Sequence, residues 1–148
     1  MSRDDLSGGD FERRKQCCGA METVAVLGPD EGGHLAAAAA RLVGMHTFDE
    51  VAALLGGIEP GLAGFKATML RLARAQGDDA VLDDASGATR IRQTTWKLMA
   101  DRPALSPAVF DALNQIWVGA ALAHDRFIRL VVTKRRDCGD DYWEWQIA

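Results

Sequence analysis

The final third of the chain carries the side chains best suited to chemistry. His124 stands next to Asp125, and a histidine beside a carboxylate can serve as a general base. Cys138 follows a run of basic residues that includes Arg135, and cationic neighbours lower the pKa of a thiol. Tyr142 completes the set of candidate catalytic residues. If the last two predicted strands pair as a hairpin, these side chains share one end of a sheet, with Arg135 placed to hold an anionic group.

Four tryptophans are candidates to line a ligand pocket. Trp143 and Trp145 alternate along the last predicted strand and therefore share one face, while Trp96 and Trp117 belong to earlier elements. Such rings can form the wall of an aromatic pocket. They can also be core residues, because burial of each ring contributes on the order of 2–3 kcal/mol. We therefore expect that the four are not all exposed, and that at least two share one cavity or core cluster.

The same residues also have structural interpretations. His124 lies near the end of a predicted helix, where the helix dipole favours a histidine, and Cys138 lies in a turn, where a thiol needs no chemical role. His34, His46 and His124 are far apart, and no His-x-x-x-His or Cys-x-x-Cys spacing occurs, so we expect no metal ion. A Walker loop, a dinucleotide fingerprint and a Gly-x-Ser-x-Gly elbow are also missing from the sequence. We expect no cofactor.

Helices are expected to fill the first half of the chain. Residues 1–9 are typical of a flexible tail, and residues 10–148 are predicted to form a single domain. Asp10 can cap a first helix over residues 11–27, which Gly28 and Pro29 end.

Three further helices are expected before residue 77. Gly44 predicts the end of a helix over residues 30–43, and the capping box that begins at Thr47 predicts a separate short helix ending at Leu55. Pro60 then begins a helix that reaches about residue 76. This helix has an apolar stripe at three- and four-residue spacing, formed by Leu62, Phe65, Met69 and Leu72.

Strand patterns dominate after residue 77. Strands are predicted over residues 80–83, 89–98, 127–136 and 142–147, and one long helix runs from Ser106-Pro107 to about Ala123. Within residues 89–98, alternation places Trp96 on one face with Arg90 and Arg92, opposite Ile91 and Gln93. The order of elements predicts an α+β fold in which N-terminal helices pack on a small antiparallel sheet crossed by one long helix.

Composition limits the classes of partner. The chain has 148 residues and a net charge of −4, with a pI near 5.3, which argues against a general affinity for nucleic acid. No apolar stretch is long enough to span a bilayer, and the first residues lack the apolar core of a signal peptide. The odd number of cysteines, two of them adjacent, predicts free thiols in a soluble cytoplasmic protein.

One family resemblance follows from the order of the Trp-bearing segments. A strand candidate over residues 90–98 precedes a helix containing Asn114-Gln115-Ile116-Trp117, and the chain closes on the segment 139–147, GDDYWEWQI. This order resembles the small bacterial proteins described as aminothiazoline-carboxylate hydrolase-like, and the related vinyl-reductase-type ligand-binding domains. The resemblance implies hydrolysis or binding of a small molecule. Those families carry a cysteine in the closing strand, where this chain has Trp143, and Cys138 lies five residues earlier.

The sequence thus favours a small-molecule enzyme, for example a hydrolase of a compact heterocyclic or amide-like metabolite, with a pocket between helices and sheet. In this hypothesis His124 is the general base, and Trp143 and Trp145 form the wall of the pocket. Two alternatives stay open: a ligand-binding or sensory module without catalysis, and an interaction subunit whose apolar surface is covered by a partner or by a second copy in a homodimer. A pocket with converging polar groups would favour the enzyme.

Overall fold

The computed structural model describes residues 30–85, 87–96 and 107–148. The predicted tail 1–9, the predicted helix 11–27 and Ser106, the first residue of the predicted long helix, lie outside these ranges. The protein is α+β. The described elements are, in chain order, α2 (Glu31–Leu54), α3 (Gly61–Ala75), β1 (Ala80–Asp83), β2 (Thr89–Gln93), α5 (Pro107–His124), β3 (Leu130–Lys134), the short 3-10 helix η1 (Arg136–Cys138) and β4 (Trp143–Ile147).

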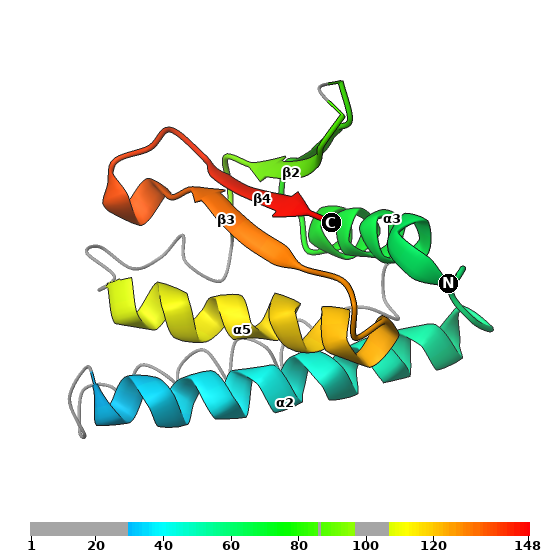
Figure 1. Ribbon diagram of the computed structural model, residues 1–148, viewed down its shortest axis with the longest axis horizontal. Coiled ribbons are helices and arrows are strands. Elements are labelled where there is room, and N and C mark those ends of the chain that lie inside the picture. Colours follow the sequence, from blue (N-terminus) through cyan, green and yellow to red (C-terminus); the bar gives the residue numbers. More distant parts are fainter. Residues whose placement is uncertain (1–29, 86, 97–106) are drawn as a thin grey trace.

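The helix α5 lies between the sheet and α2 (Figure 1). The two long helices run in the same direction, so their first turns meet at one end and their last turns at the other. At the N-terminal end Asp30 lies near Ala108, and at the C-terminal end the rings of Phe48 and His124 are 5.5 Å apart. Two parallel helices therefore form one side of the molecule.

The helix α2 is continuous where the sequence predicted two helices. Gly44 does not end the helix, and Thr47 lies in its interior. A glycine inside a helix costs about 1 kcal/mol relative to alanine, but a β-carbon at Gly44 would overlap the backbone carbonyl of Ile116 in α5. The same holds for Gly119 of α5, where an added β-carbon would overlap the backbone of Arg41 in α2. Gly44 is therefore a point of close contact between α2 and α5. The prediction that a helix ends at Gly44 was wrong.

The helix α3 agrees with its predicted limits to within one residue. Of its predicted apolar stripe, Phe65, Met69 and Leu72 are buried, and Leu62 packs against the same core. Gly64 lies against the backbone of Glu59, so the start of α3 folds closely onto the preceding loop.

The four strands form one antiparallel sheet in the order β1-β2-β4-β3. Ile91 of β2 is opposite Trp145 of β4, and Val132 of β3 is opposite Trp145 on the other side. The predicted pairing of the last two strands is confirmed, with an irregularity between Val132 and Lys134. The prediction that Trp143 and Trp145 share one face of β4 is also confirmed, because both rings contact Trp96 in the core.

The strand β2 is shorter than predicted, and this changes the position of Trp96. The strand ends at Gln93. Beyond it, the Asp79 carboxylate accepts hydrogen bonds from the backbone N–H groups of Thr94 and Thr95, at 2.9 and 2.8 Å. These bonds draw the chain out of the sheet, so Trp96 turns into the core, where it is 1% exposed. The prediction that Trp96 shares a face with Arg90 was wrong for this reason.

Candidate functional site

His124 is at the end of α5, where it connects this helix to α3. Its Nε2 atom lies 3.0 Å from the backbone oxygen of Gly61, and its ring packs against the rings of Phe48 and Phe65, with centroids 5.5 and 6.3 Å away. The neighbouring Asp125 bonds the backbone N–H of Phe127 at 2.9 Å. Both side chains therefore organise the turns around the end of α5.

Arg135 is at the opposite end of α5. Its guanidinium bonds Asp137 at 2.6 Å and Asp111, in the second turn of α5, at 2.9 Å, and it lies 4.1 Å above the ring of Phe110. The hydrogen bond that Arg135 donates to the Asp137 carboxylate raises the pKa of Arg135 above its ordinary value. Arg135 thus links the turn between β3 and β4 to the start of α5 through its ion pairs with Asp137 and Asp111.

The predicted cluster of catalytic residues is not formed. His124 and Asp111 are 13 positions apart on α5, which corresponds to about 20 Å along the helix axis, so His124 and Arg135 lie near opposite ends of α5. The expectation that they share one end of the sheet was wrong, because His124 precedes β3 whereas Arg135 follows it. Cys138 is exposed, with its Sγ atom 3.8 Å from the Asp137 carboxylate.

The tryptophans form part of the core. Trp96 makes edge-to-face contacts with Trp143 and Trp145, with ring centroids 5.9 and 5.5 Å apart, and Trp117 is 5% exposed. The indole N–H of Trp145 donates to the Asn114 side chain at 2.7 Å. The prediction that at least two tryptophans share one core cluster is confirmed. Their role as a pocket wall stays a prediction.

A charged network lies on the outer face of the sheet. The Glu144 carboxylate, although charged, is 7% exposed. It accepts a hydrogen bond from the Thr133 hydroxyl at 2.7 Å and pairs with Arg92 at 2.8 Å. Burial alone would raise the pKa of Glu144, but the bond from Thr133 and the pairing with Arg92 outweigh it and hold the pKa below its ordinary value. Arg92 in turn lies 4.3 Å above the ring of Tyr142, so Tyr142 belongs to this network and is remote from His124.

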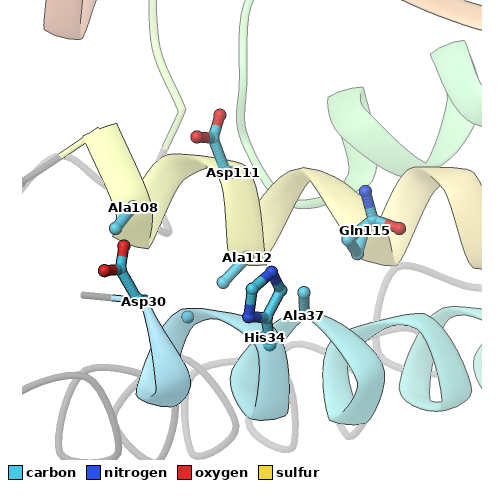
Figure 2. Close-up of a pocket in the computed structure, with 8 residues that line it drawn as sticks. Asp30, His34, Ala37, Ala108, Asp111, Ala112 and Gln115 are labelled. Carbon is cyan, nitrogen blue, oxygen red and sulfur yellow. The ribbon is translucent and has the colours of Figure 1, made fainter. Parts of the chain in front are cut away.

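A groove of about 350 Å³ lies between the first turns of α2 and α5. Figure 2 shows the His34 ring projecting from α2 toward α5, with Asp30 at one end of the groove and Gln115 at the other. Small residues form its floor and walls: Gly33, Ala37, Ala108 and Ala112. Asp111 also lines it. The groove thus combines an apolar floor with four polar side chains.

Two of these polar groups are already fixed by protein partners. The Gln115 side-chain oxygen accepts hydrogen bonds from Nε and Nη2 of Arg41 at 2.9 and 2.6 Å, which fixes the orientation of the amide group. Asp111 is held by Arg135. Asp30 and His34 are exposed. The groove therefore offers an exposed carboxylate, an exposed imidazole, and a carboxylate and an amide in fixed positions.

This groove was not predicted from the sequence. His34 was a candidate only for metal binding, and Asp30 and Asp111 had no expected role. The relevant signal was the position of each residue near the start of a helix, but nothing local in the sequence indicates that the two helices are parallel, with their first turns adjacent.

Known proteins give no further guidance. No family model, curated protein or solved structure matches this chain. Among the residues that the structure describes, no helix combines the length and apolar character needed to cross a membrane. Within the same ranges, the His, Cys, Asp and Glu side chains form no group of three that could hold a metal ion. The resemblance to hydrolase-like and ligand-binding proteins stays a prediction.

Proposed function

We propose that the protein is a small-molecule-binding module whose ligand occupies the groove between the first turns of α2 and α5. The observation that carries this proposal is a groove lined by four polar side chains and four small residues, three of them alanines. Its volume of about 350 Å³ lies at the lower end of the range of ligand pockets, roughly 300–1,000 Å³. A compact molecule, such as the heterocyclic or amide-like compound expected from the sequence, fits this size.

The charges around the groove favour a ligand that is cationic or rich in N–H donors. Asp30 and the adjacent Glu31 carry two full negative charges, and both are exposed. The charge of Asp111 is balanced by Arg135. The two helix N-termini contribute about half a positive charge each, and the Arg41 guanidinium lies against Gln115 at the other end of the groove, so the negative charge is concentrated at the Asp30 end. Among the described residues, the side chains that line the groove include no lysine or arginine.

Binding is better supported than catalysis by His124. A general base must reach the proton that it removes, whereas the His124 ring contacts the Gly61 carbonyl and two phenylalanine rings. Packing and hydrogen bonding are therefore sufficient to explain why a histidine occupies position 124. The groove lies at the other end of α5, so a variant at His124 can serve as a control for binding.

The proposal is tested with three probes of equal size and different charge. Benzamidine, benzamide and benzoate are titrated into ¹⁵N-labelled protein, and amide chemical shifts are followed. We expect benzamidine to perturb the first turns of α2 and α5, benzamide to do so more weakly, and benzoate not to do so. Equal binding of benzoate, or benzamidine shifts that map elsewhere, would contradict the proposed site.

Two variants of α2 locate the binding. Ala37→Leu fills the groove, whereas Ala38→Leu makes the same change at the next, exposed position, which does not line it. Filling a preformed space typically costs 1–3 kcal/mol, so Ala37→Leu should raise the Kd for benzamidine about tenfold. Ala38→Leu and His124→Asn should leave it unchanged to within about twofold. An equal effect of Ala37→Leu and Ala38→Leu would refute the location.

A further inference from the structure

The strands β1 and β3 are the two edges of the sheet, and an edge strand can pair with a strand of another chain. Within the described residues, no strand lies beyond either edge. Arg129 and Ala148 exchange both backbone hydrogen bonds, at 2.6 and 3.0 Å. Because antiparallel pairs alternate between bonded and non-bonded partners, the backbone N–H and C=O groups of Leu130 and Val132 point away from β4.

The same alternation, followed through β4 and β2, gives the outward residues of β1. Val81 and Asp83 bond with β2, so the backbone groups of the other two residues point away from it. These outward residues are Ala80 and Leu82. The exposed Arg74 side chain agrees with this direction, since its Nε atom donates to the Ala80 carbonyl oxygen at 2.9 Å. That oxygen has a second lone pair, so it can accept a bond from another strand as well.

We propose that β1 of one copy of the chain pairs with β3 of a second copy, so that their two sheets become one. Neighbouring strands are antiparallel throughout the order β1-β2-β4-β3, so β1 and β3 run in opposite directions. A second copy in the same orientation therefore places its β1 antiparallel to β3 of the first. Each added copy leaves one β1 edge and one β3 edge free, which makes the association open-ended.

The outward residues limit the register of this pairing, because they must lie opposite each other to exchange hydrogen bonds. In one such register the bonded pairs are Leu82 with Leu130 and Ala80 with Val132. Val81 of one copy then lies opposite Val131 of the other, and each of these valines is 57% exposed. Side chains are closest in a non-bonded pair of this kind, so the pairing covers both valines.

Charges favour the unlike edges over two like edges. In the same register Asp83, which has Arg90 opposite it on β2, lies opposite Arg129 of the other copy. Pairing of β3 with β3 would instead bring Arg129 near Lys134, and pairing of β1 with β1 would bring Asp83 near Asp79. Like charges on facing strands are destabilising. A shift of the register by two residues loses both the valine contact and the opposite charges.

The test exchanges the two opposite charges in the full-length protein. For the parent protein at low salt, sedimentation equilibrium should show a mean mass that rises with concentration from 16.0 kDa to beyond that of a dimer. Arg129→Asp or Asp83→Arg alone should raise the Kd of association about tenfold. An equimolar mixture of the two variants should recover the parent behaviour, because the altered edge of each then meets the altered edge of the other.

Two control variants make the same charge changes outside the paired residues. Arg126→Asp lies in the loop before β3 and Glu59→Arg in the loop before α3, and both side chains are exposed. Each should change the Kd by less than about twofold. Circular dichroism of every variant checks that the fold is kept.

A second measurement needs no variant. In ¹⁵N-labelled protein, the amide shifts of Leu82 and Leu130 should move together as the concentration rises, because both N–H groups point outward. A mass that stays at 16.0 kDa up to about 1 mM overturns the proposal, as does a mixture that associates no better than the single variants. A mass that levels off at the dimer overturns it in favour of pairing between two like edges.

Discussion

At the centre of the outer sheet face, the carboxylate of Glu144 is held by groups from both neighbouring strands. Thr133 donates from β3 and Arg92 from β2. A charged side chain that is 7% exposed is tolerated because these partners replace the water that it loses on folding. Alternation along β4 places Glu144 on the face opposite Trp143 and Trp145, but its partners depend on strand order, which alternation does not determine.

The depressed pKa of Glu144 makes part of the stability dependent on pH. A carboxyl group with a lower pKa in the folded state stabilises the fold above the pKa of the unfolded chain, and this contribution is lost as pH falls through the folded value. We therefore expect Glu144→Gln to lower the free energy of unfolding by about 1–2 kcal/mol at pH 7. The difference from the parent protein should shrink as the pH falls below about 4.3, the ordinary pKa of glutamate.

Urea unfolding at neutral and acidic pH measures this difference. The control is Glu59→Gln, at an exposed position in the loop before α3, and it should change stability little at either pH. A constant difference between the parent protein and Glu144→Gln across the pH range would show that the Glu144 charge is not involved.

Among the elements, the pair formed by α2 and α5 departs most from the sequence-based expectation. The rules for helix-ending glycines and for capping boxes predicted that one helix ends at Gly44 and that another begins at Thr47. Both rules describe helix ends that are free of tertiary contacts. Close contact with α5 overrides them, because only glycine allows the two backbones to approach at Gly44 and Gly119. In contrast, the limits of α3, β1 and β4 were predicted closely, since their apolar periodicity and turn residues agree with their packing.

Alanine substitutions at two glycines of α2 should therefore have opposite effects. Gly44→Ala introduces a β-carbon onto the Ile116 carbonyl and should destabilise the protein by about 1–3 kcal/mol. Gly33→Ala places a β-carbon where nothing lies within 4 Å and should be neutral or stabilising, by up to about 1 kcal/mol. Thermal or urea unfolding of both variants measures this contrast, and stabilisation by Gly44→Ala would contradict the described helix contact.

Across the whole molecule, one core joins the sheet to the helices. The buried set includes side chains of α2, α3, α5 and three of the strands, together with Trp96. The sequence predicted the fold class because apolar periodicity identifies buried faces. It could not predict the candidate site, because the groove depends on two helices that are far apart in sequence being parallel. The predicted cluster around His124 is not formed for a different reason: His124 precedes β3 and Arg135 follows it, so the two lie near opposite ends of α5.

The four buried tryptophans should report a single unfolding transition. Trp96, Trp117, Trp143 and Trp145 lie in the same core, so their fluorescence should change together with the loss of helix. We expect urea unfolding curves from fluorescence and from far-ultraviolet circular dichroism to superimpose, as they do for cooperative single domains. Separate midpoints would show that α2 and α5 unfold independently of the sheet.

The parallel arrangement of α2 and α5 also has a consequence for synthesis of the chain. Arg41 and Gln115 bond across the helix pair although they are 74 positions apart in sequence. At a translation rate of roughly 5–20 residues per second, α2 leaves the ribosome about 4–15 s before its partner helix is complete. During that interval the side of α2 around Gly44 has no α5 to pack against. Stable folding of α2 must therefore wait for the C-terminal third of the chain.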